Sequence, residues 1–173
     1  MIERPTPDEF APYYALYVDQ VPDGDVLDTL ARQAEEWVSL LDPLSDEEAQ
    51  HRYSDGKWSV KEIIGHLIDA ERCFATRAMA FARGDLTPLP NFDEQVYVRN
   101  SGAHERDLDG LLEEYRLTRA ANIALFGSFT DEAWHRRGRA SDLEFSTRAK
   151  VWILAGHQAH HTTVLRERYL TGL

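Results

Sequence analysis

Three of the seven histidines in this chain lie within five positions, in the stretch LAGHQAHHTTVLRERY that covers residues 154–169. Successive residues of a helix are rotated by about 100°, so His157 and His161 share one face with the apolar side chains of the stretch, and His160 lies to one side. Two imidazoles one turn apart on a buried face are costly unless they are satisfied. A divalent metal ion satisfies both, because an i, i+4 pair brings two ring nitrogens to one point. The H-x-x-x-H spacing also occurs by chance, and a single buried histidine is usually a hydrogen-bonded core residue.

A third ligand decides between a metal site and an ordinary core. His66 lies at the margin of the apolar face of the stretch IIGHLIDAER, and its neighbour Gly65 lets another helix approach closely. Three neutral imidazoles leave at least one position open for water or substrate, which is typical of a catalytic metal rather than a structural one. Imidazole ligands suit zinc, nickel, copper or iron and do not choose among them. Asp69 or Glu62 can orient the ring of His66 as a hydrogen-bond acceptor, or both can be solvated.

Polar residues also interrupt the apolar face predicted for a helix near residues 107–127. Tyr115, Arg119 and Asn122 all fall close to the centre of that face. A buried arginine needs an anionic or carbonyl partner, and two interpretations follow. In one, Arg119 and Asn122 line a substrate pocket beside the metal, with Tyr115 as a hydrogen-bond donor. In the other, Arg119 pairs with a core acid such as Asp69 or Glu62 and is purely structural.

The remaining histidines and the single cysteine carry less information. His51, His104 and His135 lie in polar, loop-like surroundings and are expected to be solvated. His160 is the substitute ligand if the helical register differs by one position. Cys73 stands alone, so it forms no internal disulfide, and a lone cysteine on a helix is more typical of packing than of catalysis. No catalytic acid or base is identified from the sequence.

The spacing of apolar residues predicts four long helices that position these side chains. They are expected from the cap Asp25 to just before Pro43, from the capping box of Ser59 and Glu62 to about Gly84, from about Asp107 to Gly127, and from the cap Ser146 to about Leu170, before Gly172. A short N-terminal helix is expected after Thr6, limited by Pro12. No stretch shows sustained strand alternation, and DLEFS (142–146) is expected to make only a brief extended piece. The sequence therefore predicts an all-α, four-helix bundle.

A long link separates the second and third predicted helices. Residues 85–106, DLTPLPNFDEQVYVRNSGAHER, contain two prolines and are far longer than the few residues that join antiparallel helices. The link is therefore expected to cross the bundle, so that the two helices run parallel. Such a segment either roofs a site or forms a disordered surface excursion.

The length, the apolar content and the net charge of the chain limit the class of protein. The chain has 173 residues, which fits one domain over residues 1–173, and it has no apolar run near 18 residues, so no membrane span is expected. The start MIERPTPDEF lacks the apolar stretch of a signal peptide, and a cytoplasmic location is the default. A net charge of −11 opposes binding to nucleic acid, and a small basic patch around Arg136, Arg137 and Arg139 does not outweigh it.

Three stretches resemble the DinB (damage-inducible) superfamily: GKWSVKEIIGHLIDAERCFATRAMAFARGD, LTPLPNFDEQVYV and AGHQAHHTTVLRERYL. The resemblance runs from about Tyr13 to Leu170. It implies a bundle in up-down-down-up order and a divalent metal held by three histidines. The family's W-S-x-x-E-x-x-x-H histidine matches His66, and its H-x-x-x-H pair matches His157 and His161. The resemblance implies nickel or zinc, with iron, manganese and copper left open.

The resemblance also implies a range of functions. Characterised relatives include metal-dependent transferases that join low-molecular-weight thiols such as bacillithiol or mycothiol to electrophiles, and others have been labelled hydrolases. We expect a low-molecular-weight-thiol S-transferase acting on a small-molecule substrate. A metal-dependent hydrolase and a non-catalytic, metal-stabilised binding module are the alternatives. Gln158 stands where H-E-x-x-H proteases have their glutamate, which disfavours a protease. Trp152 is expected to point away from the core as part of a homodimer interface.

Overall fold

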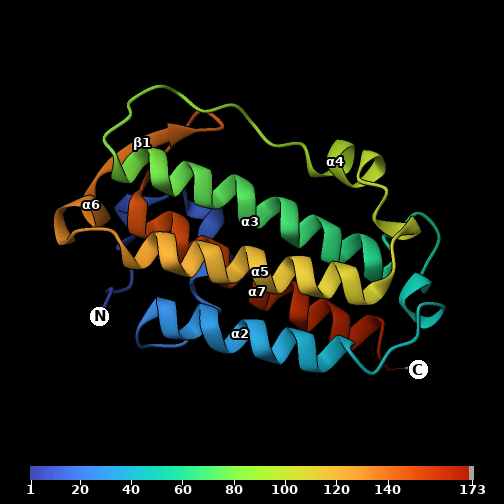
Figure 1. Ribbon diagram of the computed structural model, residues 1–173. Coiled ribbons are helices and arrows are strands. Elements are labelled where there is room, and N and C mark those ends of the chain that lie inside the picture. Colours follow the sequence, from blue (N-terminus) through green and yellow to red (C-terminus); the bar gives the residue numbers. More distant parts are fainter. Residues whose placement is uncertain (172–173) are drawn as a thin grey trace.

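The computed structural model describes residues 1–171, and its main body is a bundle of four long helices (Figure 1). These are α2 (Val26–Leu41), α3 (Val60–Ala82), α5 (Leu108–Gly127) and α7 (Thr147–Arg168). Along the bundle, α2 and α7 run in one direction while α3 and α5 run in the other. The predicted fold class and the up-down-down-up order are therefore confirmed.

The side chains predicted to cap the long helices do so. Asp25 accepts a hydrogen bond from the amide of Leu27 at 2.9 Å at the start of α2. At the start of α3, Glu62 Oε2 accepts from the Ser59 amide at 2.7 Å, while Ser59 Oγ accepts from the Glu62 amide at 3.2 Å. Caps of this kind satisfy amides that have no partner inside the helix, so they fix where each helix begins.

The predicted ends of the helices are also close to the observed ones. Asp107 and Ser146 cap α5 and α7 as expected. The second and fourth helices end at Ala82 and Arg168, each two residues before the predicted end. The glycine expected after the fourth helix, Gly172, lies outside the described residues.

The core consists of two apolar clusters, one toward each end of the bundle. Between them, at mid-length of the helices, lies a buried polar layer formed by Glu71, Arg119 and Asn122. Charged groups at this depth are stable only when they are paired and hydrogen-bonded, so the layer restricts how α3 and α5 pack.

Short elements complete the fold. They are the 3-10 turns η1 (Pro7–Glu9), η2 (Pro12–Tyr14), η3 (Glu48–Gln50) and η4 (Ala103–Glu105), the helices α1 (Ala15–Val18), α4 (Glu94–Asn100) and α6 (Asp131–His135), and the strands β1 (Arg137–Ala140) and β2 (Leu143–Ser146). The two strands form an antiparallel hairpin in which Ala140 pairs with Leu143. The intervening Ser141 and Asp142 have φ of 54° and 61°, as a two-residue type I′ turn requires. The sequence predicted the extended piece at 142–146, but β1 was not expected.

The link between α3 and α5 runs back along α3 and carries α4 (Figure 1). It is fixed to the hairpin by two backbone hydrogen bonds: Leu89 N donates to Arg139 O at 2.9 Å, and Ser141 N donates to Leu89 O at 3.1 Å. The link is therefore an ordered crossover, as the parallel arrangement of α3 and α5 requires.

The N-terminal segment covers one side of α7. A Cβ placed on Gly156 would lie 2.0 Å from the Tyr17 carbonyl oxygen, so α1 lies against α7 at a distance that only glycine permits. The same segment covers Trp152, which is 1% exposed and has the Arg4 guanidinium 4.8 Å from its ring centroid. The expectation that Trp152 forms an exposed interface was wrong. A homodimer stays a prediction, and Trp152 no longer supports it.

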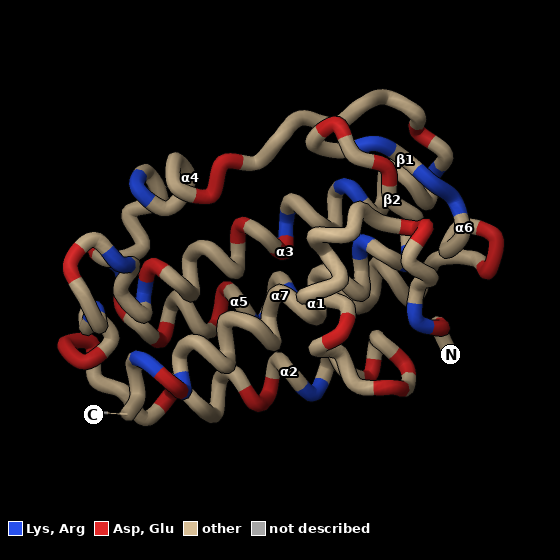
Figure 2. Tube along the Cα trace, turned by 180° about the vertical axis from the view of Figure 1, so that it is seen from behind, with Lys and Arg blue, Asp and Glu red and all other residues tan. Residues whose placement is uncertain are grey.

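Charge is unevenly distributed over the surface. Asp and Glu positions are spread along the bundle, whereas β1 contains two of the basic positions, Arg137 and Arg139 (Figure 2). Two of the three arginines of the predicted basic patch are paired with acids: Arg136 with Glu132 at 3.0 Å, and Arg137 with Asp8 at 2.7 Å. In the described part of the chain, no helix combines the length and the apolarity that a membrane crossing needs.

We predict that Gly156→Ala destabilises the protein by about 1–3 kcal/mol, because the added methyl group meets backbone atoms that cannot rotate away. Urea unfolding monitored by circular dichroism measures the change. Gly127→Ala is the matched control, since a Cβ at that helical position meets nothing within 4 Å. Equal stability of the two variants would contradict the close contact between α1 and α7.

Candidate metal centre

Three histidines from two helices meet at one point inside the bundle. The Nε2 atoms of His66 and His157 are 3.2 Å apart, and so are those of His157 and His161. One nitrogen from each ring lies within 4.8 Å of the other two. His66 and His157 are buried and His161 is half-buried. The structure therefore brings together all three side chains that the sequence singled out as metal ligands.

The three rings are held in their neutral forms. Burial lowers the pKa of His66 to about 4. Burial also holds the pKa values of His157 and His161 well below their ordinary value, and the neighbouring imidazoles lower them further. A neutral imidazole has a lone pair on one ring nitrogen, and only this form binds a metal ion. Three neutral rings whose Nε2 atoms face one another fit a divalent cation of the transition series.

The other nitrogen of the ring is left without a partner in two of the histidines. In residues 1–171, Nδ1 of His66 and Nδ1 of His157 are buried and make no hydrogen bond. The expected acceptors are elsewhere: Glu62 accepts hydrogen bonds from Arg52 and from the Ser59 amide, and Asp69 lines a different cavity. The prediction that one of these acids orients His66 was wrong. Packing positions the ring instead, with Trp58 centred 4.8 Å from it.

The histidines lie at the side of a cavity of about 370 Å³. Six aromatic residues, here called the aromatic wall, line it: Tyr13, Tyr14, Tyr17, Trp58, Phe74 and Phe92. The crossover link contributes Asn91, Phe92 and Glu94, so it roofs the site, which was one of the two interpretations of its length. A cavity of this size and composition accommodates a small organic molecule.

His160 also lines this cavity but does not join the group of three. Its ring packs edge-on against Tyr17, with the centroids 5.8 Å apart. His51, His104 and His135 are exposed, as expected. Cys73 is half-buried, and burial raises the pKa of its thiol, which opposes a role as nucleophile.

The residues predicted from the third helix are buried, but in the polar layer rather than in the cavity. Arg119 is fully buried and donates to Glu71 Oε1 from Nε at 2.9 Å and from Nη2 at 2.5 Å. Asn122 Nδ2 donates to Glu71 Oε2 at 2.7 Å. The Tyr115 hydroxyl donates to Gln158 Oε1 at 3.1 Å. Their assignment to a substrate pocket was therefore wrong.

The interpretation that Arg119 pairs with a buried acid was right, although that acid is Glu71 rather than Asp69 or Glu62. Glu71 lies five residues after His66 on α3, so it faces α5 and not the cavity.

Sequence reasoning also missed several residues of the cavity. Arg77 lines it, and its spacing of eleven residues from His66 returns a helix to nearly the same face, so helical phase predicts its position. Tyr14 and Tyr17 come from the N-terminal segment, and Ser141 comes from the tip of the hairpin. No periodic pattern in the sequence indicates that these two segments reach the site.

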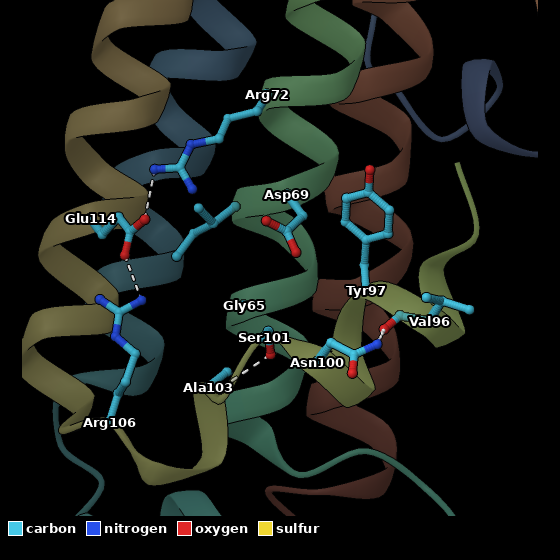
Figure 3. Close-up of a pocket in the computed structure, with 11 residues that line it drawn as sticks. Gly65, Asp69, Arg72, Val96, Tyr97, Asn100, Ser101, Ala103, Arg106 and Glu114 are labelled. Carbon is cyan, nitrogen blue, oxygen red and sulfur yellow. Dashed lines mark hydrogen bonds and ion pairs between the residues drawn. The ribbon is translucent and has the colours of Figure 1, made fainter. Parts of the chain in front are cut away.

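A second cavity of about 470 Å³ lies between α3, α4 and the start of α5 (Figure 3). Its charged groups are mostly paired, since Glu114 accepts from both Arg72 and Arg106 at 2.6 Å. Asp69 lies opposite α4, and burial raises the pKa of its carboxyl group. None of the three converging histidines lines this cavity. Its larger volume therefore does not make it the metal centre.

The fold and the site together define a class of protein: a four-helix bundle in up-down-down-up order with histidines from its second and last long helices facing one cavity. The chain belongs to the DinB superfamily, whose family model matches residues 29–165. A protein of Oceanobacillus iheyensis named "Putative metal-dependent hydrolase" is 24% identical over 160 residues, which cover 82% of this chain and 86% of the relative.

YfiT of Bacillus subtilis, which carries the same description, is 22% identical over 151 residues, covering 78% of this chain and 85% of YfiT. The solved structure of YfiT, described as "a probable metal-dependent hydrolase with an unusual four-helix bundle topology", superimposes with a TM-score of 0.70 at 17% identity. The match covers 84% of this chain and 91% of that one, and it shows that the two share a fold.

We predict that Arg119→Met costs about 3–5 kcal/mol of stability, because it leaves the buried Glu71 carboxylate without its cation. Adding Glu71→Gln to the same chain removes the isolated charge and recovers part of the loss. Urea unfolding of the single and double variants measures both effects. A single variant as stable as the wild type would show that the pair is not buried as described.

We predict that the metal-free protein loses stability as the pH falls from about 7 to 4. In this range the unfolded chain protonates His66 near the ordinary histidine pKa of 6.5, whereas the folded chain protonates it only near 4. Since the unfolded state then binds more protons, the free energy of unfolding decreases with falling pH, by on the order of 3 kcal/mol for this one ring. Urea unfolding at several pH values measures the slope of the free energy of unfolding against pH.

His66→Gln is the control for this prediction, and its slope is expected to be shallower. Parallel curves for the two proteins would contradict the neutral, buried state of His66.

Proposed function

We propose that this protein is a divalent-metal-dependent enzyme in which His66, His157 and His161 hold the ion, with nickel or zinc as the expected metal. One observation carries the proposal: three neutral imidazoles present their Nε2 atoms to one another beside a cavity large enough for an organic substrate. In residues 1–171, no other group of three histidine, cysteine or acidic residues has this arrangement. When bound by three protein ligands, such an ion keeps a position open and lowers the pKa of a thiol or water there.

We further propose that the reaction transfers a low-molecular-weight thiol to an electrophile. The residues around the site support this choice, because an unaided thiol has a pKa near 8.5 and needs no strong general base to become a nucleophile. Among the described residues that line the cavity, Glu94 is the single carboxylate, and it is exposed. Gln158 follows His157 where a glutamate base would stand, and its Oε1 already accepts a hydrogen bond from Tyr115.

The aromatic wall supports a small organic substrate. Trp58 packs on His66, and Phe74 and Tyr17 pack on His157, with ring centroids 5.8 and 5.6 Å from it. These rings exclude water from two of the three histidines and offer apolar surface to the carbon skeleton of a thiol or an electrophile.

Hydrolysis is the second candidate, and the descriptions of the two bacterial relatives favour it. It differs from thiol transfer in the nucleophile, which would be water. The two reactions are distinguished by whether product formation requires an added thiol and by whether the thiol carbon skeleton appears in the product.

We predict that protein purified without a histidine tag holds about one divalent ion per chain, and that His66→Gln or His157→Gln removes most of it. His160→Gln is the matched control and keeps the ion, since His160 lines the cavity but lies outside the converging group. Metal analysis by mass spectrometry measures the stoichiometry. If the His160 variant loses the metal as fully as the His66 variant does, the assignment of ligands is wrong.

The cobalt-substituted protein provides the test of the nucleophile. Addition of 2-mercaptoethanol is expected to produce a sulfur-to-cobalt charge-transfer band in the near ultraviolet. A protein that binds cobalt in the same stoichiometry but shows no thiol-dependent band would contradict thiol transfer and leave hydrolysis.

A further inference from the structure

The cavity that contains the histidines has a second end that carries positive charge. Arg77 lines it, eleven residues after His66 on α3, which places it on nearly the same face and about 16 Å farther along the axis. On α7, Lys150 lies seven residues before His157, on the same face and about 10 Å away along the axis. Because α3 and α7 run in opposite directions, Arg77 and Lys150 lie toward the same end of the bundle (Figure 1).

Arg77 is a buried cation without a carboxylate partner. It is 7% exposed, and its Nη2 donates to the Pro90 carbonyl of the crossover link at 2.8 Å. Its guanidinium carbon is 6.0 Å from the ring centroid of Phe74. In the described residues, no acid lies within ion-pair distance of it, and its Nε and Nη1 make no hydrogen bond. Two of its donor groups are therefore free for a ligand in the cavity.

Lys150 is a second buried basic residue, and it lies behind the aromatic wall. It is 1% exposed, and its Nζ has no hydrogen-bond partner in residues 1–171. Nζ lies 3.5 Å from the ring centroid of Phe145, and 5.3 and 5.4 Å from those of Phe74 and Tyr14. Phe74 and Tyr14 also line the cavity, so one layer of rings separates the amine from its contents. Burial and the nearby charge of Arg77 lower the pKa of Lys150 to about 7.

The other fully buried cations of the described chain are paired with acids. Arg119 pairs with Glu71 at 2.5 Å, and Lys61 pairs with Asp46 at 2.5 Å. Acids are not scarce, since the chain has 30 Asp and Glu against 19 Lys and Arg. A buried cation is costly without an opposite charge. The two basic residues that lack one, Arg77 and Lys150, both lie at this end of the cavity. Arg77 keeps its charge at neutral pH, and an anion bound beside it would also favour the protonated form of Lys150, which indicates that the missing anion belongs to a ligand.

We propose that Arg77, with the charge of Lys150 behind it, binds the anionic group of the substrate. The cavity then takes an organic anion whose carboxylate contacts Arg77 and whose apolar part lies against the aromatic wall. The planar guanidinium suits this role, because its remaining N–H groups match the two oxygens of a carboxylate. This inference rests on the proposed function in one respect: it takes the histidine end as the reactive end of the same cavity. The anion site itself needs no metal.

The test compares a carboxylate with its neutral amide. The probes are 3-phenylpropionate and 3-phenylpropionamide, which share a phenyl ring and chain length and differ in charge. Dissociation constants are measured by isothermal titration calorimetry with the full chain, both as purified and after removal of metal by chelation. The metal-free arm excludes binding of the carboxylate to the ion. We expect the carboxylate to bind about tenfold more tightly than the amide or better in both arms, since a hydrogen bond to a charged group is worth that much.

Arg77→Gln is expected to reduce this preference to within about threefold while binding of the amide stays unchanged. Arg83→Gln is the matched control, because it removes the same charge from the same end of α3 at an exposed residue outside the cavity, and it keeps the preference. Lys150→Met is expected to weaken the preference in part and to leave the fold intact, since it replaces an unpaired buried amine by an apolar side chain of similar length. Circular dichroism verifies that each variant is folded.

Equal binding of the two probes by the wild type, or an undiminished preference in a folded Arg77→Gln variant, overturns the inference. Its failure is distinguishable from failure of the proposed function. A chain that holds its metal but does not discriminate the probes loses only the anion site. A chain that discriminates the probes without holding metal keeps the anion site and loses the proposed enzyme.

Discussion

The central constraint on this structure is that three neutral imidazoles face one another at hydrogen-bonding distance inside a protein. At 3.2 Å, two adjacent Nε2 atoms are compatible only with a shared proton or with a common cation. With protons alone, His157 Nε2 can make only one of its two short contacts as a hydrogen bond, because a ring nitrogen carries either one proton or one lone pair. A cation uses all three Nε2 lone pairs at once. The arrangement is therefore far easier to explain as a binding site than as packing.

The rest of the bundle fixes this arrangement from two sides. On one side, Glu71, Arg119 and Asn122 join α3 to α5 through hydrogen bonds that only one relative position of the helices permits. On the other side, Gly156 lets α1 lie against α7 next to His157, so the N-terminal segment closes the cavity. The crossover link and the hairpin complete the roof, and Arg77 ties that roof to α3 through the Pro90 carbonyl. The N-terminal segment, the crossover link and the hairpin thus all line the cavity beside the histidines.

Local sequence signals were enough to predict the long helices and the histidines that converge between them. Caps such as Ser59 with Glu62 act within one turn, and helical phase places His157 and His161 on the buried face without any knowledge of the fold. Two of the failures have a common cause. Helical phase shows which side of a helix faces inward, but it does not show which other segment of the chain covers the opposite side. That is why Trp152 was expected at an interface and why the role of the tyrosines near the N-terminus was missed. The partner of Arg119 was not identified because phase does not show which acid of a neighbouring helix lies at the same height along the bundle.

We propose that a divalent metal at the histidine end and the Arg77 guanidinium at the other end face one cavity in an otherwise acidic protein. X-ray absorption spectroscopy of the zinc-loaded protein measures the ligands of the metal. We expect three imidazole nitrogens at about 2.0–2.1 Å from the zinc, with one oxygen ligand such as water completing the shell. A spectrum that shows one imidazole or none, or a thiolate sulfur from Cys73 in the absence of added thiol, would contradict this proposal.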